Sequence, residues 1–528
     1  MKNKKMTVLA GILAASLMLS ACGSQAGTSA DSDSVTATAE TAVTTTETTV
    51  TTVEEAVKAA EEELATVKET VISVKESDEW KDYTQEEYTD ITLADVGSTI
   101  SGEGAVADGS NITIKAGGSY VLTGTLTDGS INISVGEEEK VYLYLNGVSI
   151  SCSNGAAISE SAGDKVIISL VEGTENVISG ATTEKDSSEG NSEDTDTKIP
   201  DGAIYCQDSL TINGTGSLTV SNEAGHGIVS KDILKIMEGT ISVTAADSGI
   251  IGKDSLYVGD AHISVSCGTD GLKSSNEEEG KGYVLIEGGT IIIEAGDDGI
   301  HSESSLFITG AETSVTVAES QEGLEGNHIV ITGGAISVMA KDDGMNASGE
   351  SDQKIVITGG NIKVNAAGDG IDSNGSIYMN DGELILSGPV NDGNGTIDYV
   401  NKFIMTGGIL AGSGSSGMLQ TISSESSQYV ISYTQDTSIA AGTEITLAEK
   451  SGDSLISFTA DKESKAIVIS LPELQEGTEY QLTIGSETVT VPAEAGSDMS
   501  EGPGGQMPGG KGDMQRPDMP ENGGPLQE

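Results

Sequence analysis

A glycine that recurs at nearly regular intervals constrains the fold of this chain more than any other feature. It marks seven successive segments spaced 21 to 28 residues apart, at Gly227, Gly249, Gly271, Gly299, Gly323, Gly344 and Gly370. An apolar residue follows each glycine, and a small residue stands two positions further on. Ala203 and Ala157 occupy the same place in two less regular copies upstream. A unit this short cannot bury a core alone, so the units must stack on one another.

The residues between the glycines predict two short strands in each unit. Leu285–Ile291 and Ile355–Ile362 alternate apolar and polar residues around a Gly-Gly turn, and this period is typical of strands. No intervening stretch has the length or spacing of a crossover helix. The repeat therefore predicts an all-β fold, a parallel β-helix in which each turn buries its apolar face by stacking on its neighbours. A β-propeller is the second interpretation. We rank it lower because a propeller blade needs about 40 residues, more than the 21 to 28 residues of this repeat.

The chain divides by composition into five expected segments. They are a lipoprotein signal peptide (1–21), a low-complexity spacer (22–90), the β-helix (91–417), a small antiparallel β cap (418–494) and a disordered Gly/Pro-rich tail (495–528). The spacing of apolar residues from Val53 to Val71 allows a short amphipathic helix in the spacer. Four strands are expected in the cap, at Tyr429–Tyr433, Ser454–Ala460, Ala466–Leu471 and Tyr480–Ile484.

The N-terminal residues predict export and a lipid anchor. Three lysines precede the apolar run Val8–Leu19, which is too short for a stable membrane span. Leu19-Ser20-Ala21-Cys22 has the form of a bacterial lipobox, so we expect cleavage before Cys22 and lipid on its sulfur. The expected location is the extracellular face of a bacterial membrane. The type of envelope and the oligomeric state stay open.

The charge of the chain limits its partners. With 26 Lys+Arg against 83 Asp+Glu, the formal net charge is −57. Nucleic acid is excluded as a partner, because phosphate binding requires lysine and arginine. An acidic polysaccharide would be repelled as well, unless bound cations bridge the two surfaces.

Carboxylates line up with the repeat. The residue before the glycine is acidic in five consecutive copies, and we expect it to face outward at a spacing of about 4.8 Å between stacked turns. Such a ladder is repulsive unless some groups are protonated or bind cations. Hard oxygen donors favour Ca²⁺, whereas the column contains no thiolate or imidazole for zinc or copper. The candidate metal ligands are Asp270, Asp297, Asp298, Glu322, Asp342, Asp343, Asp369 and Asp372. The alternative is that each Asp only hydrogen-bonds its own turn.

Several stretches of the chain together match one known family. They are Ala156-Ala157-Ile158, Gly173-Thr174-Glu175-Asn176, Gly368-Asp369-Gly370-Ile371-Asp372-Ser373-Asn374-Gly375, Asn391-Asp392-Gly393-Asn394-Gly395 and Pro472-Glu473-Leu474. They resemble the bacterial carbohydrate-binding domain-containing lipoproteins that include a clostridial cellulose- and pectin-binding, calcium-dependent β-helix protein. The resemblance covers roughly residues 90 to 490 and implies a right-handed single-stranded parallel β-helix similar to the pectate-lyase solenoid, bound calcium and binding of plant cell-wall polysaccharide. His226 and Ser248 stand where usual members carry the acid.

Three functions are compatible with these residues. We expect a non-enzymatic surface protein that binds pectin, polygalacturonate or cellulose, with calcium as the cofactor. A structural stalk or adhesin without a glycan ligand is the first alternative. The second is a pectate-type lyase with a lysine base, and Lys231, Lys253 and Lys273 flank the repeat turns. We expect His301 and His328 to be surface residues, and Phe307 and Phe403 to point into the core.

Overall fold

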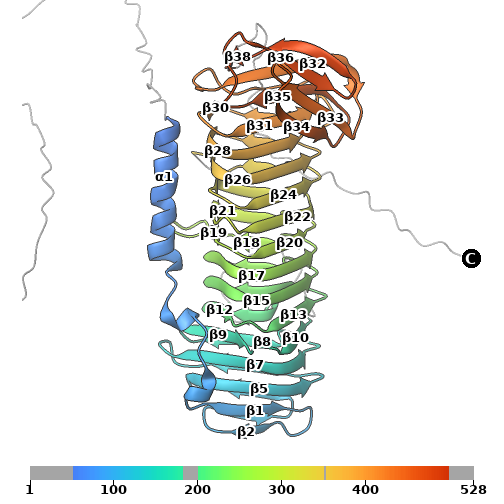
Figure 1. Ribbon diagram of the computed structural model, residues 1–528. Coiled ribbons are helices and arrows are strands. Elements are labelled where there is room, and N and C mark those ends of the chain that lie inside the picture. Colours follow the sequence, from blue (N-terminus) through green and yellow to red (C-terminus); the bar gives the residue numbers. More distant parts are fainter. Residues whose placement is uncertain (1–51, 182–199, 350–351, 499–528) are drawn as a thin grey trace, which may run out of the picture. The chain divides into compact units, whose positions relative to one another are not determined.

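The computed structural model describes residues 52–181, 200–349 and 352–498. Within these ranges, 34 strands join in one sheet that winds through successive stacked turns (Figure 1). A separate antiparallel sheet of four strands belongs to the C-terminal end. The predicted parallel β-solenoid with a small antiparallel cap is therefore confirmed. The predicted signal peptide, Cys22 and nearly all of the Gly/Pro-rich tail lie outside the described residues.

Each turn of the solenoid contributes strands to three faces. The short-strand face contains β4 (Asn111–Ile114), β6 (Ser130–Ser134), β8 (Ile158–Ala162), β11 (Gly202–Cys206), β14 (His226–Ser230), β16 (Ile250–Gly252), β18 (Leu272–Ser274), β25 (Met345–Ala347), β27 (Ile371–Ser373), β29 (Ile397–Tyr399) and the first residues of β21 (Ile300–Ile308) and β23 (Leu324–Ile331). The ends of β21 and β23 continue into a helix-covered face, with β1 (Thr89–Leu93), β9 (Lys165–Leu170), β12 (Ser209–Asn213), β19 (Tyr283–Ile286) and β30 (Lys402–Met405).

The third face, called the open face below, carries no helix. It contains β10 (Glu175–Gly180), β13 (Ser217–Asn222), β20 (Thr290–Glu294), β22 (Ser314–Ser320), β24 (Ala335–Ala340) and β31 (Ile409–Gly414). Longer strands bend at a corner and belong to both the helix-covered and open faces: β5 (Gly118–Leu126), β7 (Lys140–Ser151), β15 (Ile233–Ala245), β17 (Ser255–Cys267), β26 (Lys354–Ala366) and β28 (Ser376–Ser387). At the N-terminal end, β2 (Thr99–Ser101) and β3 (Ala105–Asp108) pair antiparallel with β1 and β4.

Inward-pointing side chains from the three faces form one continuous core. The apolar residues that follow the repeat glycine stack on the short-strand face, where Ile250, Leu272, Ile300 and Leu324 are fully buried. Each such side chain contributes about 1.5–3 kcal/mol when it leaves water. The repeated sequence thus becomes a stack of equivalent core positions.

The repeat glycine is required by close approach and not by its backbone angles. At Gly249, an added Cβ would lie 2.3 Å from Val265 Cγ1 and 2.8 Å from the carbonyl oxygen of Gly271. None of the seven repeat glycines has a positive φ. Positive φ occurs instead in the Gly-Gly turns of the opposite corner, where Gly360 has φ +93°. A side chain at the repeat position would therefore push the next turn away.

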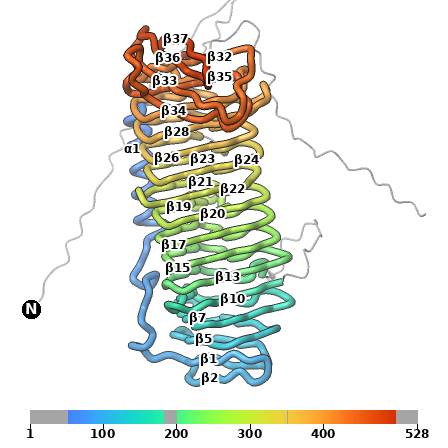
Figure 2. Tube along the Cα trace, turned by 45° about the vertical axis from the view of Figure 1, so that its right-hand side comes forward, coloured from blue at the N-terminus to red at the C-terminus, as the bar shows by residue number. Residues whose placement is uncertain are grey.

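Helix α1 (Val53–Thr66) packs on the solenoid through a stripe of apolar side chains. Thr52 caps it, since Thr52 Oγ1 accepts a hydrogen bond from the Glu55 amide and the Glu55 carboxylate accepts one from the Thr52 amide. Figures 1 and 2 show the helix running along the stacked turns. Opposite it stands an outward-pointing apolar ladder formed by Tyr257, Leu285, Phe307, Val330, Val356, Tyr378 and Ile404.

Two expectations change because of this helix. Phe307 is buried as expected, but it faces α1 and not the interior of the solenoid, whereas Phe403 does belong to the inner core. The helix-forming stretch of the expected spacer is also part of the folded body. The reason is that the helix-covered face carries apolar residues on both sides of its strands, so its outer side must be shielded from water.

The chain continues from α1 along the same face and is fixed there by a buried carboxylate. A helical turn, Val67–Ile72 (η1), leads to two 3-10 turns, Glu76–Asp78 (η2) and Tyr83–Gln85 (η3). Asp78 is fully buried, pairs with Lys165, and accepts a hydrogen bond from Lys235 Nζ at 2.9 Å. Burial alone would raise the pKa of Asp78, but the hydrogen bond and charge of Lys165, together with hydrogen bonds from the Lys75 amide and from Lys235, outweigh it, so the pKa falls to about 2. We call residues 52–88 the strap. Its second half is held to the early turns by the ion pairs of Asp78 with Lys165 and Lys235.

Replacing Asp78 by Ala should strongly destabilise this attachment. Two buried ammonium groups would lose their counter-charge, and breaking a buried pair costs about 3–5 kcal/mol. We expect a lower thermal unfolding midpoint and faster proteolysis within the strap. Asp82→Ala is the matched control, because Asp82 is an exposed acid of the same segment that only caps a turn with Thr84. Equal stability of the two variants would contradict this role of Asp78.

The cap is built from antiparallel strands after the last turn. Its strands are β32 (Tyr429–Ile439), β33 (Thr443–Ala448), β34 (Ser454–Ala460), β35 (Ser464–Ser470), β36 (Glu479–Ile484), β37 (Glu487–Pro492) and β38 (Glu494–Ala495). The sequence predicted four of these and missed three: β33 and β37, which complete the separate sheet, and the two-residue β38. β35 pairs antiparallel with β31 and so closes the edge of the open face. Among the described helices, none has the length and apolar character needed to cross a membrane.

Candidate metal-binding site

The five acidic residues before the repeat glycine form a registered column along one corner of the solenoid. The amides of five of the seven repeat glycines donate to the carbonyl of the acidic residue one turn later, each over 2.9 Å. The donor and acceptor pairs are Gly249 and Asp270, Gly271 and Asp298, Gly299 and Glu322, Gly323 and Asp343, and Gly344 and Asp369. We call these five acids the first column. The backbone therefore fixes the stacking that the sequence predicted.

A second column stands beside the first, three residues later in each turn. Its members pair as neighbours on the short-strand face, in the order Lys273, His301, Glu325, Asn346, Asp372 and Asp398. The composition of this column changes along the stack from basic groups to an amide and acids. It therefore decides how the charge of the first column is compensated at each level.

In the earlier turns, the protein supplies its own cations. Lys273 Nζ lies 2.6 Å from Asp270 Oδ2, which also accepts a hydrogen bond from Ser248 Oγ. One turn later, His301 Nδ1 lies 3.1 Å from Asp298 Oδ2 and 2.6 Å from Glu325 Oε2. The first column is covered here, because Asp270 and Asp298 are only 3% and 7% exposed.

The imidazole of His301, which lies between Asp298 and Glu325, favours its protonated form. Burial alone would lower the pKa of His301, but its hydrogen bonds to the two carboxylates outweigh burial and raise the pKa to about 10. The imidazole is therefore charged at neutral pH. Although the three side chains are close enough to hold a metal ion, the imidazolium already places one positive charge between the two carboxylates. Burial also raises the pKa of Asp298 to about 7, so this group is a poorer cation site than one without a protein cation.

In the later turns, the carboxylates have no such partner. One oxygen each of Asp343, Asp369 and Asp372 lies within 4.8 Å of the others. In the described part of the chain, none of the three pairs with a lysine or a histidine. Burial, followed by repulsion from neighbouring carboxylates, raises the pKa of Asp369 to about 6 and that of Asp372 to about 7. This cluster, called the late acidic cluster below, is the place where a cation would relieve the most repulsion.

A buried amide oxygen stands next to the late acidic cluster. Asn346 is 9% exposed and pairs with Asp372 in the second column. Its Nδ2 donates to Glu322 Oε2 at 2.8 Å, while its Oδ1 has no hydrogen-bond partner among the described residues. An unsatisfied buried carbonyl is costly and is also a favoured calcium ligand. Asn346 thus adds a neutral oxygen beside three carboxylates.

The remaining predicted ligands are placed differently. Asp297 is exposed and lies within ligand distance of Asp270 and Asp298. Glu322 and Asp342 belong to neither compact acidic group of the described residues; Glu322 binds Asn346, and Asp342 accepts a bond from Gln321. The eight candidates therefore do not form one site but are divided between the two ends of the column.

Two expectations about side chains near the column are wrong. Asp270 and Asp298 are buried and not exposed at the surface, because Lys273 and His301 cover them. His301 and His328 are partly buried and not surface residues; His328 Nδ1 lies 3.1 Å from Glu63 Oε2 of α1. The first column itself contains no thiolate or imidazole, and the imidazole of His301 stands beside it in the second column. The repeated spacing of three residues after each acid was the sequence signal that could have revealed these partners.

The lysines considered as catalytic bases are not alike. Lys273 is engaged by Asp270, and Lys231 Nζ lies 3.4 Å from Asp201 Oδ2 and over the Tyr205 ring. Lys253 is exposed on the corner of the solenoid. A base must present a free amine to the substrate, and Lys231 and Lys273 instead serve as counter-ions of the protein.

Replacing His301 by Gln should destabilise the protein at neutral pH. Asp298 and Glu325 would then face each other without the imidazolium, at a cost on the order of 2 kcal/mol, less than for a fully buried pair. The pKa of His301 is raised in the folded state, so its contribution is complete below about pH 6.5 and is lost as the pH rises toward 10. Denaturant unfolding at pH 6 measures the loss. His262→Gln, an exposed histidine on the open face, should be neutral, and equal losses for both would refute the assignment.

The late acidic cluster predicts a specific pH dependence in the absence of metal. The pKa values of Asp369 and Asp372 are raised on folding, so the folded state binds more protons than the unfolded state between about pH 4 and 7. The stability contributed by these groups must therefore fall as the pH rises through this interval. Asp369→Asn/Asp372→Asn should remove this slope and raise the midpoint at pH 8 by about a few degrees in chelator. An unchanged slope, measured by calorimetry, would contradict the burial of the cluster.

Comparisons with known proteins identify one family to which the sequence is similar. The profile of a family described as carbohydrate-binding domain-containing protein matches residues 108–352 and again 315–468, together more than half of the chain. A curated protein of that description from Acetivibrio thermocellus is 36% identical over 134 residues, which cover 25% of this chain and 45% of the relative. The chain thus spans less than half the length of that relative.

Among solved structures, a polysaccharide lyase-like protein from C. thermocellum, determined as a gadolinium derivative, is 31% identical in sequence with a TM-score of 0.39. The match covers 47% of this chain and 93% of the other. On the extent of the profile match, this chain belongs to the family of carbohydrate-binding domain-containing proteins.

Proposed function

We propose that this protein binds acidic plant cell-wall polysaccharide, such as pectin or polygalacturonate, through calcium and without catalysing a reaction. The observation that carries the proposal is the late acidic cluster of Asp343, Asp369 and Asp372, which has no protein cation in the described residues. The lipid anchor on Cys22 at the outer face of the bacterial membrane is part of the same proposal, on the lipobox residues alone.

The donor set of the late acidic cluster suits calcium. Three carboxylates and the free Oδ1 of Asn346 are hard oxygen donors, and Ca²⁺ takes six to eight such ligands. The remaining positions can be filled by water or by carboxylates of a bound glycan. Asp398 stands next to Asp372 in the second column and raises its pKa further, so it adds negative charge close to the ion.

Because the chain is strongly negative, an acidic polysaccharide is the kind of glycan whose binding would need calcium. A protein with a net charge of −57 repels a polyuronate. A cation held partly by Asp343 and Asp369 and partly by the uronate removes that repulsion where the two surfaces meet. Flat cellulose is the weaker candidate, because it is usually bound by exposed aromatic rings. Trp80, the sole tryptophan, belongs to the strap and packs edge-on against Tyr144 of β7, so it does not lie on the open face.

Removing calcium should abolish binding. We expect polygalacturonate to retain the protein in calcium and to release it in chelator. Asp343→Asn/Asp369→Asn should lose about one bound calcium and weaken glycan binding by tenfold or more, since two charged ligands are lost. Asp260→Asn/Asp381→Asn removes two exposed acids at another corner and should leave both properties unchanged. Equilibrium dialysis with calcium and affinity gels measure the two effects.

The outcomes separate the competing functions. Retention that persists in chelator would overturn the calcium bridge. Absence of binding to any uronate polymer would favour a structural stalk. Unsaturated uronide absorbance that appears during incubation would show a lyase, and Lys253→Ala would then test the exposed lysine as the base.

A further inference from the structure

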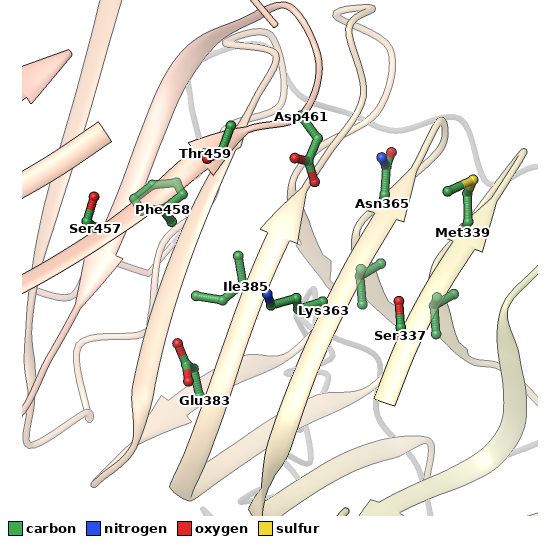
Figure 3. Close-up of a pocket in the computed structure, with 12 residues that line it drawn as sticks. Ser337, Met339, Lys363, Asn365, Glu383, Ile385, Ser457, Phe458, Thr459 and Asp461 are labelled. Atoms are coloured by element: carbon green, nitrogen blue, oxygen red, sulfur yellow. The ribbon is translucent and has the colours of Figure 1, made fainter. Parts of the chain in front are cut away.

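A groove lies on the open face, where cap strand β34 borders the last turns of the solenoid. Its floor is made of outward-pointing side chains of three neighbouring strands, β24, β26 and β28, and its wall is cap strand β34 (Figure 3). The groove has a volume of about 420 Å³, within the range of small-molecule sites. It lies on a different face from the second column.

The lining of the groove combines apolar and hydrogen-bonding side chains. Met339, 55% exposed, and Ile385 offer apolar surface on the floor, with Phe458 in the wall. Asn365 and Thr459 add polar groups that can donate or accept. The carboxylates of Glu383 and Asp461 also line the groove and can accept hydrogen bonds from sugar hydroxyl groups (Figure 3). A sugar ring presents apolar C–H faces and a rim of hydroxyl groups, so a mixed surface of this kind suits a carbohydrate better than a purely apolar ligand.

Lys363 gives the groove a charge that the protein does not use. It is exposed on the floor beside Ile385, its direct neighbour on β28. Within the described residues, its ammonium group makes no hydrogen bond and no ion pair. In a chain with 83 acidic residues, an unpaired lysine in a groove is an attachment point for a ligand carboxylate.

The groove leads toward the late acidic cluster. Met339 and Asn365 stand four residues before Asp343 and Asp369 in their respective turns. At about 3.3 Å per residue, the two features lie at most about 13 Å apart along the chain. One oligosaccharide can therefore reach from the groove to the corner that carries the acids.

We propose that this groove is a second glycan site, which contacts a uronate residue of the polysaccharide through protein side chains and adds to the affinity of the calcium bridge, but is too weak alone to retain the polymer in chelator. The uronate carboxylate pairs with Lys363, and the ring packs on Met339 and Ile385. The proposal rests on the proposed function for the class of ligand, but it assigns a separate site in which the cation is a side chain of the protein. The late acidic cluster needs a metal ion to bind the same polymer.

The test uses the full chain and oligogalacturonides of defined length in titration calorimetry. Lys363→Met keeps the apolar stem and removes the charge, and it should weaken binding by about tenfold or more in calcium. Lys363→Arg should retain most of the affinity, and Lys115→Met, an exposed lysine near the N-terminal turns, should retain all of it. A methyl-esterified oligomer, which has no charge, should bind Lys363→Met and the unchanged protein equally.

The outcomes distinguish the two sites. If Lys363→Met binds as the unchanged protein does while Asp343→Asn/Asp369→Asn does not, the groove proposal is wrong and the calcium proposal stands. If binding survives chelator but is lost in Lys363→Met, the calcium proposal is wrong and the groove stands as a glycan site that needs no calcium. Equal weakening by Lys115→Met would mean that the lysine acts only through net charge, and this would also overturn the groove proposal.

Discussion

The contact between each repeat glycine and the next turn is the constraint on which the rest of the structure depends. Because the glycine has no Cβ, the carbonyl oxygen of the following copy and a strand valine or isoleucine approach its Cα closely. The same contact carries the hydrogen bond that joins successive turns. The acidic residue just before the glycine consequently cannot move away from its neighbours, and its charge must be compensated within the corner.

The second column compensates that charge in two different ways on one scaffold. In earlier turns, Lys273 and His301 neutralise the acids, and the corner becomes a set of internal ion pairs. In later turns, Asn346 and Asp372 occupy the equivalent positions, and negative charge accumulates. Since the backbone is the same throughout, residue type in a single column decides whether a turn supplies its own counter-ions or accumulates negative charge.

The fold could be predicted from the sequence because periodicity is a local signal. The repeat predicted stacked turns, and the acid column followed from their register. The partners in the second column were harder to identify, since their proximity depends on how the corner bends between Asp298 and His301. The packing of α1 on the solenoid is visible in the sequence. Val284-Leu285-Ile286 is apolar at three successive positions, which indicates a strand buried on both sides, whereas Ile362-Lys363-Val364 on the open face alternates.

The groove could not be predicted, because it depends on where the cap rests on the solenoid. Phe458 and Lys363 are almost a hundred residues apart, and no repeat relates them. Ile385 is shared between the floor of the groove and the edge of the cap's apolar cluster. Contacts between two independent sheets of this kind leave no periodic pattern in either one.

The strap runs opposite to the growth of the solenoid, and this order has a mechanical consequence. Helix α1 contacts β26 and β28, η1 contacts β17, and Asp78 reaches back to β9 and β12. A pull on the chain at Thr52 would therefore load the apolar contacts of the helix first and the buried ion pairs of Asp78 next. The strand pairing of the stacked turns would be loaded last. The contacts of the strap would thus be lost in stages before the stacked turns of the solenoid separate.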